Sequence, residues 1–265
     1  MRKCVAAVLL LCGNMGIAQV PLPLDRALQH HVAYPESEAT AAWRALAASY
    51  VRKAVREQKL DRDPVLNARV DAVMVAVGAA VGAIDPRFAG ASWNALLIED
   101  FGHGAVAFPG ETILIDAKFV RNLALGDDEL ALILSHEAAH VISGHASEKL
   151  SFMAEFLGKE KIPTAHTALL EFLAKDSYAA VFQPKAQLQE READTVGAAI
   201  LFAAGFDPQR ALQVFDKLIE LEARDSVRAG QVADSHDTAL ARKRTVSGVI
   251  AELQALDARR GPQLR

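Results

Sequence analysis

Residues 129–143 form the apolar stretch that most constrains the fold, because their pattern is helical and yet includes ionisable side chains. Acidic residues precede the stretch, where the helix dipole favours them, and Gly144 follows it, where helices commonly end. Within it, His136-Glu137-Ala138-Ala139-His140 places two histidines four residues apart, so both project from one helix face.

These five residues form an H-E-x-x-H pattern, whose side chains suit a zinc ion. Imidazole nitrogens are common zinc ligands, and a catalytic zinc keeps three protein ligands so that water can occupy the fourth position. Glu137 is turned partly off the ligand face, from which its carboxylate can take a proton from that water. We predict one Zn2+ per chain, with His136 and His140 as ligands and Glu137 as general base. Two solvent-facing histidines on a structural helix are the alternative interpretation.

A second cluster, Glu190-Arg191-Glu192-Ala193-Asp194, offers a third metal ligand. It lies on a helix predicted over residues 188–204, which ends at Gly205. Glu190 and Asp194 are four residues apart on one face, so Glu190 can bind the metal while Asp194 holds a ligand histidine. Glu192 is expected to point elsewhere. A solvated acidic helix start is the competing interpretation of the cluster.

A third histidine ligand close to the first two is not predicted. A metzincin-type site would need glycine at position 143 and histidine at position 146, where this chain has Ser143 and Ala146. His145 is instead predicted to lie at the end of the helix beside Gly144, where it interacts with exposed carbonyl groups. The third ligand is therefore sought in the acidic cluster.

The rest of the chain predicts an α+β fold that is mostly helical. Apolar residues recur at helical spacing in three further segments, residues 36–60, 64–83 and 238–256. Short apolar runs punctuated by glycine and proline predict a small sheet, at residues 93–99, 105–108 and 112–116. Residues 150–188 separate the two predicted ligand helices and are long enough to include a lid.

The first residues have the order of a secretory signal. A basic start at Arg2 and Lys3 is followed by an apolar run and then by small residues at Gly16 and Ala18. We predict a signal peptide over residues 1–18 and one domain over residues 19–265, exported to the periplasm. Acylation of Cys12 as a lipoprotein is a weaker alternative, because Leu11 stands where that processing requires a small residue.

Composition excludes several functions. Both cysteines lie within the predicted signal peptide, so thiol catalysis and cysteine zinc sites are excluded from the mature protein. The 265 residues carry a formal net charge of −4 and no basic run, so a nucleic-acid partner is not expected. The apolar run over residues 72–84 is too short for a typical membrane span and is predicted to be a core helix.

Taken together, these motifs resemble those of the zinc peptidases that include HtpX, the CAAX prenyl proteases, the mitochondrial Oma-type proteases and the BepA-like proteins. The resemblance covers residues 64–253. Besides the H-E-x-x-H and the acidic cluster, it rests on Gly197 and on two short sequences, Gly205-Phe206-Asp207-Pro208 and Ala105-Val106-Ala107-Phe108-Pro109-Gly110.

The resemblance implies a gluzincin-like metallopeptidase domain with its sheet beside the H-E-x-x-H helix. It assigns His136, His140 and Glu190 as the metal ligands, Glu137 as the catalytic base and Asp194 as the acid behind a ligand. It also implies that an extended polypeptide substrate binds along the strand at residues 105–109. Two departures, Gly104 in place of asparagine and Glu111 in place of glycine, suggest that the substrate is gripped differently.

The sequence Ser235-His236-Asp237, with Arg242 six residues after His236, resembles the family's downstream His-Pro loop and arginine, although Asp237 replaces the proline. We hypothesise that His236 or Arg242 faces the metal and stabilises the oxyanion of the tetrahedral intermediate. A surface loop before the last helix is the alternative interpretation for His236.

The sequence therefore predicts a zinc-dependent endopeptidase of the cell envelope that hydrolyses peptide bonds in unfolded or misassembled proteins. Two alternatives remain open. One is a zinc-containing envelope chaperone or binding protein with a latent or self-inhibited site. The other is a purely structural zinc domain, in which His236 would supply a fourth protein ligand. A separate partner that recruits the enzyme is a further expectation.

Overall fold

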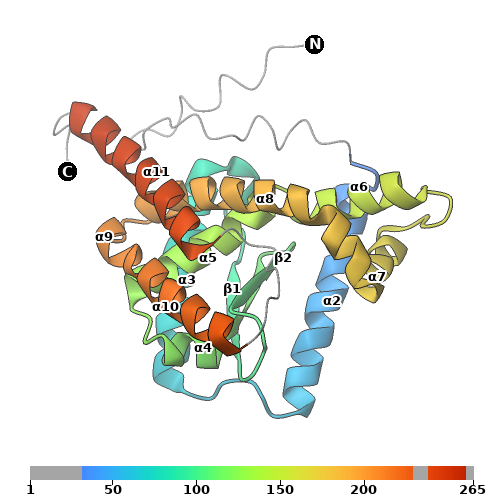
Figure 1. Cartoon of the computed structure of the whole chain (residues 1–265), viewed down its shortest axis with the longest axis horizontal. Coiled ribbons are helices and arrows are strands. Elements are labelled where there is room, and N and C mark those ends of the chain that lie inside the picture. The colour runs from blue at the N-terminus through green and yellow to red at the C-terminus, as the bar shows by residue number, and fades with distance from the viewer. Residues whose placement is uncertain (1–31, 229–237, 261–265) are drawn as a thin grey trace.

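The computed structural model describes residues 32–228 and 238–260, which form helices around one three-stranded sheet (Figure 1). The elements in chain order are α2 (Glu36–Arg56), α3 (Pro64–Ile84), η2 (Pro86–Phe88), β1 (Asn94–Ile98), β2 (Ala105–Phe108), β3 (Thr112–Asp116), α4 (Ala117–Asn122), α5 (Asp127–Ile142), α6 (His145–Leu157), α7 (Ala165–Ala174), α8 (Asp176–Ala203), α9 (Pro208–Ala211), α10 (Gln213–Arg228) and α11 (Ala239–Arg260). The mostly helical α+β class predicted from the sequence is confirmed.

The sheet has the order β1-β3-β2, so within the described residues β2 lies at an edge. β1 runs parallel to β3, and β2 runs antiparallel to it, with Val106 opposite Leu114. The Asp116 amide donates to the Gly104 carbonyl, so alternate residues of β2 bond to β3. The main-chain groups of Ala105 and Ala107 consequently point away from β3, toward the outer side of the sheet.

One departure from the family pattern, Glu111 in place of glycine, lies in the turn between β2 and β3. Glu111 has φ 58°, in the left-handed region that favours glycine, and Gly110 before it has φ 94°. The family's glycine at this position thus matches what the backbone requires. Glu111 tolerates the conformation here and forms an ion pair with Arg44 at 3.6 Å.

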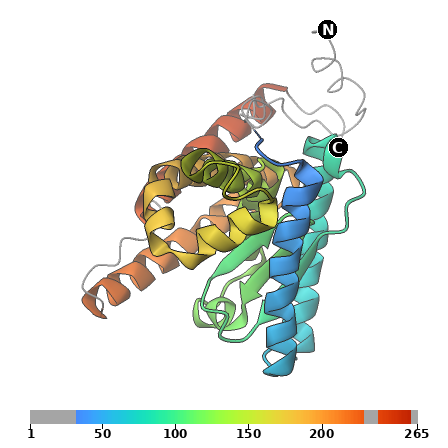
Figure 2. The same ribbon diagram turned by 90° about the vertical axis from the view of Figure 1, so that its right-hand side faces the viewer.

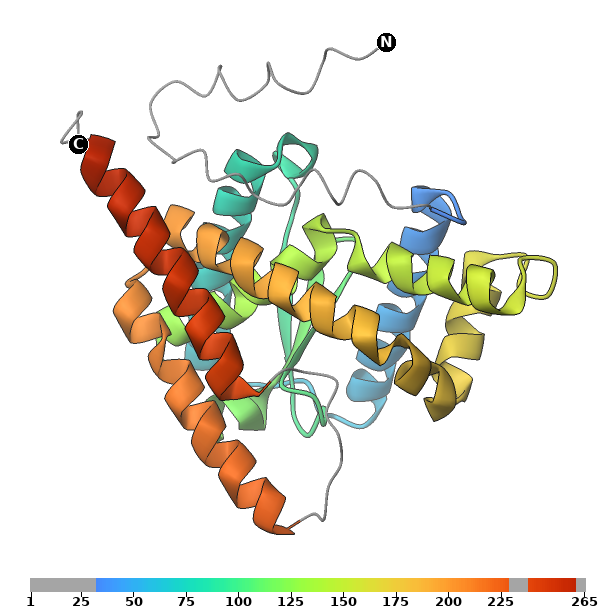
Figure 3. The ribbon, with the colours of Figure 1, turned by 45° about the horizontal axis from the view of Figure 1, so that its top comes forward.

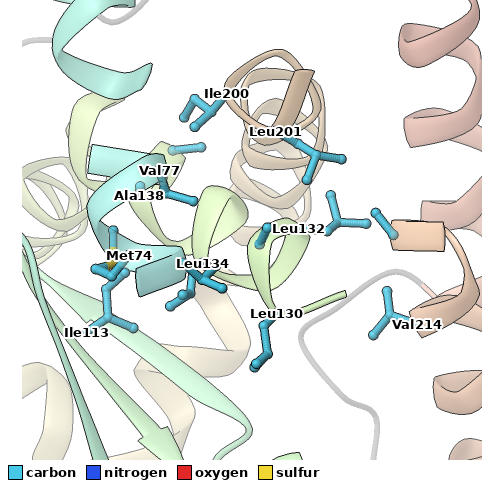
Figure 4. Packing of buried hydrophobic residues seen from close by; sticks show 14 of the residues in the cluster. Met74, Val77, Ile113, Leu130, Leu132, Leu134, Ala138, Ile200, Leu201 and Val214 are labelled. Carbon is cyan, nitrogen blue, oxygen red and sulfur yellow. The ribbon is translucent and has the colours of Figure 1, made fainter. Parts of the chain in front are cut away.

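Helix α5 lies at the centre of the core, which explains why its sequence is apolar on several faces. Leu130, Leu134 and Ala138 are fully buried. Figure 4 shows Leu134 near Met74 of α3 and Ala138 near Val77 of the same helix, with Leu130 further along α5. The H-E-x-x-H helix is therefore a core helix, and its polar residues Ser135 and His136 are buried with the apolar ones.

Helix α3 is long and apolar enough to cross a membrane by length and composition, the one such helix among the described residues. Its buried side chains nevertheless belong to the same core as α5 and the sheet, and include Val70, Val77 and Val81. All three side chains are fully buried. In this structure α3 packs as the core helix that its sequence predicts.

Helix α8 begins earlier than predicted. The sequence suggested a start near Leu188, whereas α8 starts at Asp176 and passes through Pro184. Proline removes a donor from the helix and leaves the carbonyl of Ala180 without its usual partner. Ala180 is exposed, so water can bond to that carbonyl, and buried Phe182 anchors the segment to the protein.

Residues 150–188, which the sequence showed to be long enough to include a lid, are mostly helical. They comprise most of α6, all of α7 and the first part of α8. Helix α7 packs against α2 (Figure 2). Leu150 and Met153 of α6 and Leu169 of α7 are buried in a second core with Trp43. On the opposite side of the molecule, α11 crosses α8 and pairs with α10 (Figure 3). These crossings bring α6, α8 and α11 to one end of α5.

Candidate metal centre

Helices α5 and α8 approach so closely that a side chain at the crossing point would not fit. A Cβ atom built on Gly197 would lie 2.9 Å from the Cα and 3.0 Å from the backbone nitrogen of His136. Glu190 and Asp194 precede Gly197 by about two turns and one turn, on the same face of α8. The close crossing therefore brings both carboxylates beside the histidines of α5.

The predicted metal ligands form one cluster. Ligand atoms of His136, His140 and Glu190 all lie within 4.8 Å of one another. The two Nε2 atoms are 3.1 Å apart, and the carboxylate oxygens of Glu190 lie 3.3 Å from Nε2 of His136 and 3.4 Å from Nε2 of His140. Zinc bonds of about 2.0–2.2 Å in a tetrahedron place ligand atoms roughly 3.3–3.6 Å apart. The donor set and its spacing thus fit a tetrahedral ion with an open fourth position.

The charges around His136 favour a cation at this point. Burial and the nearby Arg242 lower the pKa of His136, but hydrogen bonds to Asp194 and Glu190 outweigh them and raise it to about 9. Burial, followed by the charge of His136, holds the pKa of His140 well below its ordinary value. The carboxylates that hold a proton on His136 would equally attract a metal ion in its place.

Asp194 and Arg242 lie behind His136. Nδ1 of His136 is 3.0 Å from Oδ1 of Asp194, which leaves Nε2 facing Glu190. Arg242, from α11, donates to the same carboxylate, with Nη2 2.8 Å from Oδ1 and Nε 3.1 Å from Oδ2. Burial would raise the pKa of Asp194, but hydrogen bonds from His136 and Arg242 hold it below its usual value. Asp194 thus lies behind a ligand histidine, the position predicted from the sequence.

Arg242 also contacts the ligand itself, since its Nη2 lies 3.1 Å from Nδ1 of His136. This geometry ties Arg242 to the Asp194–His136 pair, and its part in stabilising an oxyanion stays a proposal. His236, the other candidate for that part, lies outside the described residues.

Glu137 faces the sheet. Its Oε2 accepts a hydrogen bond of 2.8 Å from the backbone amide of Ala107, one of the outward-pointing groups of β2. The carboxylate is therefore held between the metal ligands of α5 and the edge strand. A base in this position is adjacent to any chain that pairs with β2.

The predicted interaction of His145 with exposed carbonyl groups was wrong. His145 is 3% exposed, and its Nδ1 lies 2.8 Å from Nδ1 of His140, so it does not cap exposed carbonyl groups. Glu192 does point away from the ligand cluster, as predicted, and its Oε2 lies 3.6 Å from Nε2 of His145. Helical periodicity could not find this contact, since Gly144, with φ 72°, turns the chain between α5 and α6. The one signal in the sequence was Gly144 directly before His145, which indicated that the chain could change direction there.

A core helix that carries two histidines, a glutamate ligand from a second helix and a glutamate beside the strand edge define a gluzincin-like metallopeptidase fold. The model of peptidase family M48 matches residues 64–250, well over half of the chain. The chain belongs to peptidase family M48, whose members are metal-dependent.

Individual relatives agree with this assignment. The chain is similar to the mitochondrial metalloendopeptidase OMA1 of Schizosaccharomyces pombe, with 26% identity over 61% of this chain and 48% of that protein. OMA1 of Saccharomyces cerevisiae is 26% identical over 50% of this chain and 39% of its own length. The beta-barrel assembly-enhancing protease of Escherichia coli K12 is 22% identical over 71% and 39%. The matches thus span less than half the length of each of these relatives.

Proposed function

We propose that this protein is a zinc-dependent endopeptidase that cleaves unfolded or misassembled polypeptides in the cell envelope. The observation that carries the proposal is the position of Glu137, next to the His-His-Glu cluster and hydrogen-bonded to the edge strand. Membership of a peptidase family supports hydrolysis of a peptide bond as the reaction. A chaperone or a structural zinc domain would not need a carboxylate at this point.

The chain supplies a place for the metal and a base. Bound between His136, His140 and Glu190, zinc would supply a Lewis acid that polarises the scissile carbonyl and makes water more acidic. Glu137 takes a proton from the attacking water and returns it to the leaving amine as the carbon–nitrogen bond breaks. Asp194 accepts the Nδ1 proton of His136, which keeps Nε2 of that ring directed at the cluster.

The edge strand is the proposed substrate site. The outward main-chain groups of Ala105 and the outward carbonyl of Ala107 can pair with an extended polypeptide, while the Ala107 amide holds Glu137. A chain paired in this way would pass beside the base. An unfolded segment readily presents its unpaired backbone to β2, which supports unfolded or misassembled proteins as the substrate class.

Export is proposed from residues 1–18, which lie outside the described residues. Purification from a bacterial periplasm followed by intact-mass measurement tests this location. Cleavage after Ala18 predicts a mature chain that begins at Gln19. Retention of the leader in the cytoplasm, or a lipid attached to Cys12, would contradict the proposed processing.

The activity is tested by digestion of an unfolded protein, casein, with and without a chelator. Wild-type protein should cleave casein, and the chelator should abolish cleavage. Glu137→Gln should retain zinc and lose about 10²–10⁴-fold in rate, because the base is removed. Glu220→Gln, at an exposed site on α10, is the matched control and should cleave normally. Zinc-loaded wild type that leaves casein intact would favour the binding-protein alternative.

A further inference from the structure

Two polar residues at the metal centre, the buried His145 and the partly buried Glu192, take no part in the chemistry described above. His145 begins α6 and lies directly behind His140, with the two rings edge to face and their centroids 4.9 Å apart. Glu192 lies on α8, between Glu190 and Asp194 in the chain, and its side chain is 17% exposed. Nε2 of His145 and Oε1 of Glu192 are buried without a hydrogen-bond partner. Buried polar groups of this kind call for an explanation.

The positions of the protons on these rings follow from the metal site. Nε2 of His140 faces His136 and Glu190, so a metal there requires a lone pair on Nε2 and leaves the proton of a neutral ring on Nδ1. That Nδ1 lies 2.8 Å from Nδ1 of His145, which must therefore be the acceptor. The proton of His145 is then on Nε2, the atom that faces Glu192.

The charge of Glu192 favours this arrangement. Its Oε2 lies 3.6 Å from Nε2 of His145, longer than a hydrogen bond but close enough for attraction between the carboxylate and the N–H group. A side-chain shift of about 0.5 Å would form the hydrogen bond. With the proton of His145 on Nδ1 instead, two N–H groups would face each other at 2.8 Å.

We infer that His145 and Glu192 are positioning residues for the metal ligand His140. In this arrangement, the Nδ1–H group of His140 donates to His145, and the Nε2–H group of His145 faces the carboxylate of Glu192. The pair fixes the tautomer and the orientation of His140 without touching the metal, since His145 lies on the far side of the ring from the cluster. The inference rests on the proposed metal site.

Each acidic residue of the cluster on α8 then has a separate role at the metal site. Glu190 contributes to the ligand set, Asp194 holds His136 directly, and Glu192 acts on His140 through His145. Glu190 and Asp194 share the face of α8 that meets α5, whereas Glu192, two residues from each, points to a different side, toward His145. His145 lies between the two, with its Nδ1 beside His140 and its Nε2 beside Glu192.

The test is the zinc affinity of the metal-free protein, measured by competition with a chelator of known affinity. His145→Leu removes the acceptor and should weaken zinc binding about 10–100-fold, the usual effect of losing such a partner. His145→Asn should restore most of the affinity, because its amide oxygen can accept the proton of His140. His166→Leu, the same substitution at an exposed position on α7, should leave the affinity unchanged.

Wild-type affinity in His145→Leu would overturn the inference, as would equal weakening in the leucine and asparagine variants. Should His145→Leu fail to fold, Glu192→Ala supplies the test: it should weaken zinc binding, and unchanged affinity would overturn the inference. A wild-type protein that binds no zinc would instead refute the proposed function, and the inference with it. The two failures are therefore distinguishable.

Discussion

Single residues at the metal centre are held by partners from other elements. Asp194 of α8 receives hydrogen bonds from Arg242 of α11 and contacts His136 of α5. Asp194 is 3% exposed, so its charge depends on these partners rather than on water. The orientation of His136 consequently depends on the packing of α11.

Replacing Arg242 tests this dependence. Arg242→Gln leaves the buried carboxylate of Asp194 short of positive charge and should lower the free energy of unfolding by about 3 kcal/mol. Arg242→Lys keeps the charge but loses the two-pronged contact, so its loss should be smaller. Urea unfolding of the metal-free proteins measures both effects. Equal stability of wild type and Arg242→Gln would show that the ion pair contributes nothing.

The candidate residues of the metal cluster could be predicted from helical periodicity within each helix and from the family resemblance, which assigned Glu190 as the third ligand. His136 and His140 share a face of α5, and Glu190 and Asp194 share a face of α8. The position of His145 could not be predicted, because it depends on the direction in which the chain leaves Gly144. Arg242 was expected near the site, but its bond to Asp194 depends on how α11 crosses α8.

At the scale of elements, the crossing of α5 and α8 determines whether the ligands meet. Gly197→Ala places a methyl group against the backbone of His136, which cannot yield as a flexible side chain could. The helices must separate, so the substitution should cost about 1–3 kcal/mol and also weaken zinc binding. Thermal unfolding and zinc competition measure the two effects.

Gly248→Ala is the control for the loss of a helical glycine. Gly248 lies within α11 with open space around its Cα, so alanine should stabilise the protein by about 0.5–1 kcal/mol. Opposite signs at the two positions would confirm that Gly197 is required for close packing. Stabilisation by Gly197→Ala would contradict the proposed role of the crossing.

An ion-pair network joins the chain before α3 to the sheet and α4. Arg121 forms ion pairs with Asp61 and with Glu99, and the amide of Asp63 donates to Asp61 at 2.6 Å. Burial raises the pKa of Asp61, but the hydrogen bonds from the Asp63 amide and from Arg121 outweigh it and hold the pKa below its usual value.

This shift predicts a dependence of stability on pH. Because the folded-state pKa of Asp61 lies below its unfolded value of about 3.9, its contribution is present above that pH. The contribution is lost as the pH falls through the folded-state pKa. Asp61→Asn should therefore be less stable than wild type at neutral pH, with a smaller loss on acidification. Parallel curves of unfolding free energy against pH would contradict this assignment.

The sequence also predicted most elements but misplaced the start of α8. Short strands and amphipathic helices were found because their apolar periodicity is local. The first part of α8 was missed because Pro184 normally ends a helix, and its continuation depends on the burial of Phe182 against α6 and α7. Such tertiary packing leaves no local signal in the sequence.

For the molecule as a whole, the proposed metal links helices that are distant in sequence. Ligand binding to the folded state alone stabilises it by about 4 kcal/mol when the free ligand is at about 1,000 times its dissociation constant. A chelator should therefore lower the melting temperature of wild type. It should have far less effect on Glu190→Gln, which lacks one ligand. Equal shifts in the two proteins would show that the chelator acts elsewhere.

The most direct test of the account is anomalous diffraction at the zinc absorption edge from crystals of the zinc-loaded protein. The account predicts one peak per chain, bonded to Nε2 of His136, Nε2 of His140 and a carboxylate oxygen of Glu190. A peak at another position, or a fourth protein side chain bonded to the ion in place of water, would contradict the catalytic centre described above.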